Sequence, residues 1–212
     1  ISAIATPAMA YEAGDWLVRG RIVQVNPNDD SGSLFVNGAD TGPGVKVDND
    51  TIPELDITYM IDRNWGVELI LGYSNHTVTG EKGATATSLG DVIDTKVLPP
   101  TLTLQYHFAP DSNIRPYIGA GINYTYFFDE KVVGSELPAA GAKVKLEDSW
   151  GLAAQAGVDI ALNDDWFVNL DVKYIQMDTT AKFSNVINGT VSANIDADID
   201  PFVYGIGIGR KF

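Results

Sequence analysis

The sequence lacks cysteine, and this absence removes several kinds of chemistry. Without thiols the chain can form no disulfide framework, no thiolate metal site and no cysteine nucleophile. Long uncharged apolar runs are also missing, since none approaches the roughly 18 residues that a membrane-spanning helix needs. Basic residues are few, with 14 Lys and Arg against 28 Asp and Glu, and the formal charge is −14. Because nucleic acid is a polyanion, this balance makes DNA and RNA poor partners.

The length of 212 residues fits one domain comfortably. The first ten residues carry no charge and end in Ala8-Met9-Ala10, the small-x-small pattern that signal peptidase cuts after. We therefore expect residues 1–10 to be either the remnant of a secretion signal or an N-terminal tail. Residues 11–212 are then expected to form a single folded unit.

The sequence does contain regular alternation. In eight segments, apolar side chains occupy every second position and small, polar or charged ones stand between them, as strands of a lipid-facing barrel require. In the first segment, Trp16, Val18 and Ile22 share one face while Arg19 and Arg21 share the other. The predicted segments are 16–25, 51–61, 65–76, 97–108, 114–128, 144–162, 166–177 and 198–212.

The connections alternate between short and long. Those at 62–64, 109–113 and 163–165 are short, and those at 26–50, 77–95, 129–143 and 178–197 are long. Aromatic residues also gather at the two sets of segment ends, with Trp16, Trp65, Phe108, Trp166 and Phe212 at one and Tyr73, Tyr124, Tyr126 and Tyr174 at the other. Short periplasmic turns, long extracellular loops and two aromatic girdles are typical of an outer-membrane barrel. We predict an all-β fold, an eight-stranded antiparallel transmembrane barrel in the bacterial outer membrane.

An eight-stranded barrel has an interior just wide enough for side chains to fill it. The face opposite the apolar one carries charges of both signs that can neutralise one another, and a wide aqueous pore is therefore not expected. The predicted inward charges are Arg19, Arg21, Glu54, Asp56, Glu68, Arg115, Glu147, Asp159, Asp171, Lys173 and Lys211.

Three motifs connect the chain to a known family. They are Leu98-Pro99-Pro100-Thr101-Leu102, the run from Arg115-Pro116-Tyr117 to Asn123-Tyr124, and Asp148-Ser149-Trp150-Gly151. In the order and spacing of these motifs, the sequence strongly resembles the OmpW family. The resemblance implies a barrel whose extracellular half is an apolar funnel, with lateral release of small hydrophobic molecules into the outer leaflet. Phe212 also resembles the C-terminal aromatic residue that the barrel-assembly machinery recognises.

Pro99 and Pro100 mark a place for such a lateral opening, because neither has an N–H group to donate to a strand ladder. The alternative is that the two prolines simply end a strand at the barrel rim. Candidate funnel residues are Val23, Val25, Ile70, Val97 and Phe127, for which ordinary interior packing is the alternative. In the family an aliphatic and an aromatic side chain narrow the lumen below the funnel. Ile70 matches the first, but Lys173 stands at the position of the second, which argues against a simple hydrophobic gate.

Other functions find less support in the sequence. The chain has two histidines, His76 near Ser74 and His107, too little for a convincing catalytic site. The acidic groups Asp29, Asp30, Asp48 and Asp50, and Asp196, Asp198 and Asp200, lack the glycine and distal glutamate of an EF-hand. We therefore expect no enzyme, no metal site and no cofactor. A channel for small amino acids and a structural or adhesive barrel that anchors surface loops remain alternatives. The expected partners are outer-membrane lipid and lipopolysaccharide, small hydrophobic solutes and the barrel-assembly machinery.

Overall fold

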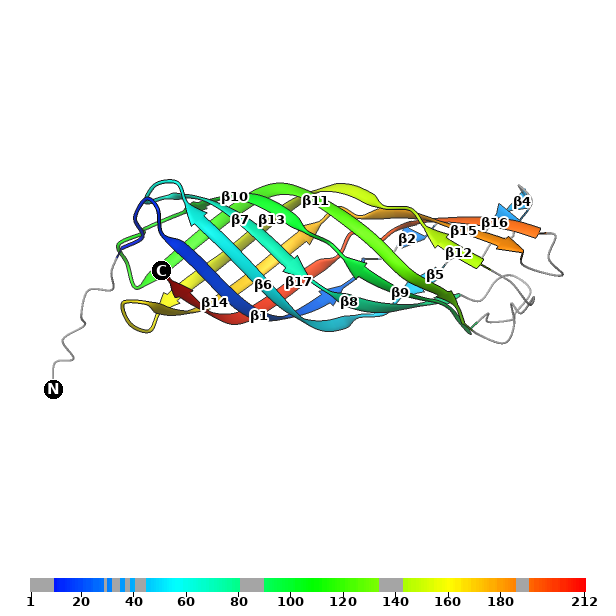
Figure 1. Ribbon diagram of the computed structural model, residues 1–212, viewed down its shortest axis with the longest axis horizontal. Coiled ribbons are helices and arrows are strands. Elements are labelled where there is room, and N and C mark those ends of the chain that lie inside the picture. The colour runs from blue at the N-terminus through cyan, green and yellow to red at the C-terminus, as the bar shows by residue number, and fades with distance from the viewer. Residues whose placement is uncertain are drawn as a thin grey trace.

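The computed structural model describes residues 10–28, 30–31, 35–36, 39–40, 45–80, 90–133, 143–185 and 191–212. All the regular secondary structure in these residues is β-strand (Figure 1). Within the same residues there is accordingly no helix with the length and apolar character needed to cross a membrane. The proposed tail, apart from Ala10, lies outside the described residues.

Eight of the strands close into a barrel. Each pairs antiparallel with two neighbours in the order β10-β7-β6-β1-β17-β14-β13-β11, and β11 pairs back with β10. The closed ladder leaves no edge, which satisfies the backbone polar groups that lipid cannot hydrogen-bond. The predicted eight-stranded antiparallel barrel is confirmed. Its strands are β1 (Trp16–Asn26), β6 (Asp50–Met60), β7 (Trp65–Gly72), β10 (Thr101–His107), β11 (Ile114–Val132), β13 (Ser149–Ala161), β14 (Trp166–Ile175) and β17 (Phe202–Lys211).

Side chains alternate between the interior and the outer surface along each strand. In β1, Arg19 and Arg21 are buried in the interior, whereas Trp16 and Ile22 on the outside are 48% and 56% exposed. Leu102 and Leu104 of β10 and Ile118 and Ile122 of β11 are exposed in the same way. An outer surface that is apolar around a polar interior is the arrangement that lipid requires.

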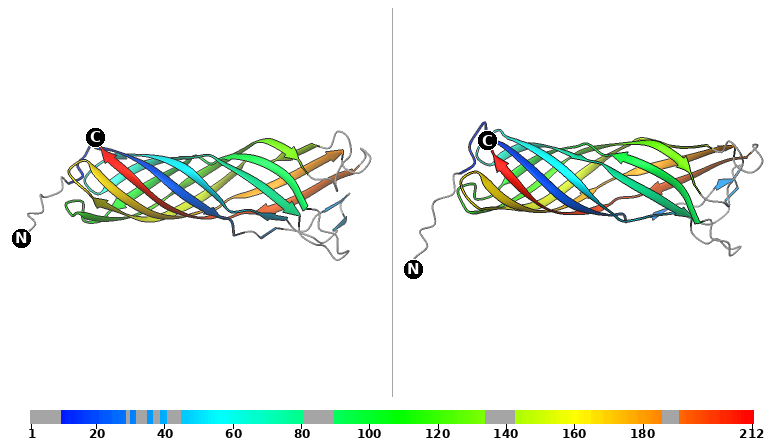
Figure 2. Two further views of the ribbon diagram at one scale, coloured as in Figure 1. Left: turned by 90° about the horizontal axis from the view of Figure 1, so that it is seen from below. Right: turned by 60° about the horizontal axis from the view of Figure 1, so that its bottom comes forward.

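The short turns gather at one end of the tube, which we call the short-turn end, and the C-terminus lies there (Figure 2). Trp16 and Phe212 exchange two backbone hydrogen bonds of 3.1 and 2.9 Å at this end. In one turn, the Asp62 carboxylate accepts the amide protons of Asn64 and Trp65, which lowers the pKa of Asp62. Asn163 accepts those of Asp165 and Trp166 in the same manner. This shared chemistry keeps both turns tight.

At the opposite end, the wall continues beyond the closed barrel as two sheets. One joins the last part of β11 to β9 (Gly90–Leu98), β8 (Ser74–Gly80) and β5 (Val45–Val47). The other contains β12 (Lys143–Leu146), β15 (Asp178–Asn185), β16 (Val191–Asp198), β2 (Asp30–Ser31), β3 (Phe35–Val36) and β4 (Ala39–Asp40). The prediction of loops across 77–95 and 178–197 was therefore wrong over most of their length. Apolar side chains such as Val78, Ile93, Phe183 and Ile195 are buried on the inner face of these sheets, which gives the strands a reason to continue.

A second correction concerns the predicted segment 144–162. The chain leaves strand geometry at Glu147 and Asp148, between β12 and β13. The pair Leu146↔Ala181 is shifted by one residue from the register of Ala153↔Ile175 below it. A shift of one residue exchanges the two faces of a strand. Leu146 is therefore buried, while Glu147, predicted to point inward, lies outside and pairs with Lys182.

Candidate functional site

The lumen is closed at the short-turn end by an apolar cluster. Tyr11, Leu17, Met60 and Phe167 form it, and each is at most 1% exposed. The Tyr11 hydroxyl donates to Asp159 Oδ2 at 2.9 Å. The residues just before β1 therefore turn back into the mouth of the barrel and fill it.

Above this cluster, two buried arginines bind several carboxylates. Arg19 lies 2.8 Å from Asp159 and 3.1 Å from Glu68, measured between the closest N and O atoms. Arg21 lies 2.9 Å from Asp56 and 3.0 Å from Asp171 in the same way. Because removal of one partner leaves a buried charge unpaired, such a network resists disruption.

Lys173 completes this layer on the side away from the short turns. Its Nζ lies 2.6 Å from Glu54 Oε1 and 2.8 Å from Asp171 Oδ1. Gln155 and Gln105 donate to Glu68 Oε2 at 2.8 and 2.7 Å, so uncharged groups occupy much of the remaining space. We call this layer the ionic plug, and it consists of Arg19, Arg21, Glu54, Asp56, Glu68, Asp159, Asp171 and Lys173.

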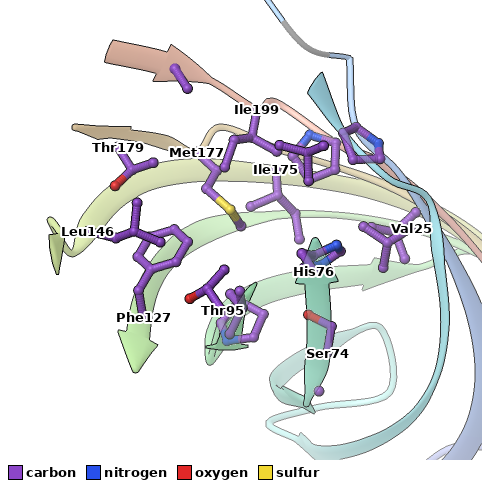
Figure 3. A pocket seen from close by; sticks show the side chains of 18 of the residues that line it. Val25, Ser74, His76, Thr95, Phe127, Leu146, Ile175, Met177, Thr179 and Ile199 are labelled. Atoms are coloured by element: carbon purple, nitrogen blue, oxygen red, sulfur yellow. The ribbon is translucent and has the colours of Figure 1, made fainter. Parts of the chain in front are cut away.

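An apolar cavity lies directly above the ionic plug, with Glu54 at its floor. The space inside it that the centres of water molecules can occupy is about 80 Å³. Figure 3 shows the side chains of Phe127 of β11, Ile175 of β14 and Met177, which lies just before β15, extending into it. An apolar molecule can replace water there without leaving many polar groups unpaired.

All five predicted funnel residues line this cavity. Val23, Ile70, Val97 and Phe127 are at most 5% exposed, and Val25 is partly buried. Lys173, the sixth residue singled out in the lumen, lies below the cavity as part of the ionic plug. Their role in transport stays a prediction.

Sequence reasoning missed most of the lining. The residues not foreseen include Val47, Ile52, Val78, Ile93, Leu146, Ile175, Met177, Ala181, Ile195, Ile199 and Val203. A signal was present, because inward positions change from charged to apolar along a strand: Arg19 and Arg21 are followed by Val23 and Val25. The assignment of 178–197 to a loop concealed the continuation of this pattern.

The wall beside the cavity is interrupted at Pro99 and Pro100. Registered pairs between β10 and β7 end at Thr101↔Ile70, and those between β8 and β9 resume at Ser74↔Val97. Residues 71–73 and 98–100 therefore face each other without ladder pairs. Gly72 and Pro99, one from each side of this break, line the cavity.

The break affects one side of the Pro99–Pro100 segment. On the other side, the Pro100 carbonyl accepts the Tyr124 backbone amide of β11 at 3.1 Å. The Asn123 side chain, which is buried inside the lumen, places Nδ2 3.3 Å from the Pro99 carbonyl from within. Successive residues of an extended chain direct their N–H and C=O groups to opposite sides. Since Pro100 faces β11, the missing N–H of Pro99 is the one that would face residues 71–73.

Pro201, which lines the same cavity, shows how such an interruption can be sealed. Pro201 lies just before β17, and the preceding Asp200 has a positive φ of 36°. The Asp200 carboxylate accepts the Met177 amide and the Tyr174 hydroxyl, both at 2.9 Å, while the Pro201 carbonyl accepts the Ile175 amide. Side-chain hydrogen bonds therefore close this junction.

The two histidines occupy different environments. His107 is buried at the short-turn end, where its ring packs against Tyr11 and Tyr117. His76 lines the cavity with Ser74, and its Nδ1 lies 3.3 Å from the Asp48 carbonyl oxygen. In the part of the chain that the structure describes, no group of three or more His, Asp or Glu side chains could hold a metal ion.

Comparison with known proteins agrees with this architecture. The chain matches the OmpW family over residues 12–212. Outer membrane protein W of Vibrio cholerae serotype O1 is 39% identical over 207 residues, which cover 97% of this chain and 92% of that protein. Dibenzothiophene metabolism operon protein PahQ of Pseudomonas aeruginosa is 31% identical over 212 residues, covering 99% and 93%. The crystal structure of outer membrane protein OprG from Pseudomonas aeruginosa aligns with a TM-score of 0.87 and 40% identity, covering 96% of this chain and 98% of that one.

Proposed function

Because this chain belongs to the OmpW family, we propose that it is a passive channel for small hydrophobic molecules. It is a bacterial outer-membrane barrel, and its family has a channel-type fold rather than that of an enzyme family. In this proposal, solutes enter the apolar cavity from outside and leave sideways into the membrane. The exit lies between residues 71–73 and 98–100.

One observation carries the proposal: the apolar cavity ends on the ionic plug and reaches the wall break at Gly72 and Pro99. Burial favours an apolar solute by about 25 cal/mol per Å² of surface removed from water. Continuing downward would require it to separate paired, desolvated ions such as Lys173 and Glu54, which is costly. The sideways path leads instead from one apolar environment to another.

The name of one relative supports the proposal that the transported solutes are hydrophobic. PahQ is named for an operon of dibenzothiophene metabolism, and dibenzothiophene is an apolar aromatic compound. Its similarity to this chain extends over 99% of the residues here. We therefore include fused aromatic hydrocarbons and their sulfur analogues among the candidate solutes.

A charge placed in the cavity should block uptake. Ile175 lines the cavity and is 5% exposed, so Ile175→Asp would introduce a carboxylate that an apolar solute must desolvate. We expect uptake of a fluorescent apolar solute into proteoliposomes to fall about tenfold, the effect of about 1.4 kcal/mol. The matched variant Ile175→Leu should retain the parental rate, because it changes shape but not polarity.

The same assay distinguishes a channel for hydrophobic molecules from a channel for small amino acids. If the protein is an amino-acid channel, Ile175→Asp should leave uptake of labelled alanine unchanged or raise it. Unchanged uptake of the apolar solute in a folded Ile175→Asp variant would contradict the proposed route.

A further inference from the structure

We propose that a groove on the outer surface between β11 and β12 binds phosphate groups of lipopolysaccharide. Phe127 and Leu146 line both this groove and the apolar cavity, but phosphate binding at the groove does not depend on the proposed uptake. Its lining includes Tyr126 and Phe128 of β11, Lys143 and Lys145 of β12, and Lys182 of β15. Figure 1 shows these strands neighbouring one another beyond the closed part of the barrel.

The groove exists because the wall changes partners there. The ladder between β11 and β13 ends at Thr125↔Ser149, after which β11 pairs with β9 and β12 pairs with β15. No registered pair joins β11 to β12 among residues 126–132 and 143–146. The Leu146 amide donates a hydrogen bond of 3.4 Å to Glu130 Oε1, and this bond spans the two strands.

The lysines of the groove repel one another. Lys145 lies directly opposite Lys182 in the β12–β15 ladder, and both point outward because Leu146 and Ala181 are buried behind them. Like charges in this position destabilise a strand pair. Glu147 compensates Lys182. Within the described ranges, no carboxylate comes within salt-bridge distance of Lys143 or Lys145, so an added anion would relieve the repulsion.

Four carboxylates also line the groove, and each already has a partner. Asp129 lies 2.7 Å from Lys96 and 3.3 Å from Lys131, measured to their Nζ atoms. Asp148 Oδ2 accepts the Tyr124 hydroxyl at 2.7 Å. Glu130 binds the Leu146 amide, as described above, and Glu147 binds Lys182. A hydrogen bond from an amide or a hydroxyl does not neutralise a carboxylate, so these four negative charges stand against five lysines, Lys96 and Lys131 included. The groove therefore has a small positive excess, although the whole chain is acidic.

The height of the groove indicates which anion reaches it. Tyr126 and Phe128 stack at 5.7 Å between ring centroids and continue the aromatic belt that includes the exposed Trp150. Lys145 stands five residues beyond Trp150, and since the chain leaves strand geometry at Glu147 and Asp148, this is at most about 16 Å along the wall and about 12 Å along the membrane normal after tilt. That level belongs to the phosphorylated sugars of the outer leaflet. On β16, the exposed Asp196 and Asp198 would repel the same glycolipid.

The test compares two triple variants that lose the same charge. Lys143→Gln, Lys145→Gln and Lys182→Gln remove the groove cations, whereas Lys46→Gln, Arg63→Gln and Arg210→Gln remove exposed cations elsewhere. Binding of deep-rough lipopolysaccharide to the folded, detergent-solubilised full chain is measured by surface plasmon resonance in EDTA. We expect the groove variant to bind at least about tenfold more weakly, because each basic residue near an anionic surface adds to the binding free energy. The control variant should bind like the parent.

A second comparison identifies the chemical group. Enzymatically dephosphorylated lipopolysaccharide should bind the parent as weakly as native lipopolysaccharide binds the groove variant. Equal affinity of native and dephosphorylated glycolipid would overturn the proposal. So would an equal loss in both triple variants, because it would show an effect of net charge alone. The uptake assay with an apolar solute reports separately on the proposed transport function.

Discussion

Replacing Pro99 and Pro100 together with valine is expected to reduce uptake of an apolar solute about fivefold, since a new wall hydrogen bond contributes about 1 kcal/mol. Valine restores the N–H group that proline lacks, and at position 99 this group would face residues 71–73. The strands can then pair across the break and seal the exit. Uptake is measured in proteoliposomes, where no other outer-membrane protein contributes. The single variant Pro99→Val should account for most of the loss, because Pro100 is held on the β11 side.

The matched control is Pro116 of β11, another outward proline. It lies opposite Val158 of β13, and on its other side its carbonyl accepts the Phe108 amide at 2.8 Å. Pro116→Val should leave uptake at the parental rate, because the wall is continuous at this position. If Pro99→Val with Pro100→Val stays folded and transports apolar solutes as fast as the parent, the sideways route is wrong. A structural barrel or an axial channel would then be the better explanation.

Much of the barrel could be predicted because its rule is simple. A strand with lipid on one side and a polar lumen on the other must alternate, and Trp16 to Ile22 show this period directly. The inward Arg19 and Arg21 also indicated a lumen filled by charges. The motif Leu98-Pro99-Pro100 marked the interruption of the wall, because proline lacks an amide donor whatever surrounds it.

The extracellular half was harder to predict because the polar and apolar faces of the strands exchange sides there. Above the membrane the outer face meets water and the inner face becomes apolar, so Ile195 points inward while Asp196 points outward. A reading based on lipid-facing apolar residues assigns such a segment to a loop. The slip at Glu147 and Asp148 could not be foreseen either, since one extra residue reverses the faces of β12 without changing its composition.

The ionic plug leads to a second prediction of large effect. Arg21→Met is expected to lower the free energy of unfolding by about 3–5 kcal/mol, because breaking a buried ion pair leaves its partners uncompensated. Arg21 contacts Glu54, Asp56, Glu68 and Asp171, and its side chain is fully buried. Methionine fills similar space but supplies no charge. Urea unfolding in detergent micelles, followed by tryptophan fluorescence and by the heat-dependent shift in electrophoretic mobility, measures the change.

Arg63→Met provides the control, because Arg63 pairs with Asp111 on the outside of the short turns, where both side chains are more than half exposed. An exposed pair contributes about 0–1 kcal/mol, so the unfolding midpoint should hardly move. If Arg21→Met is as stable as the parent, the carboxylates around it must already be hydrated. A hydrated lumen would no longer force an apolar solute sideways at the floor of the cavity, and the axial route would reopen as an explanation. A large loss confined to Arg21→Met instead places a dry, paired barrier directly beneath the cavity, which is the condition that the lateral exit requires.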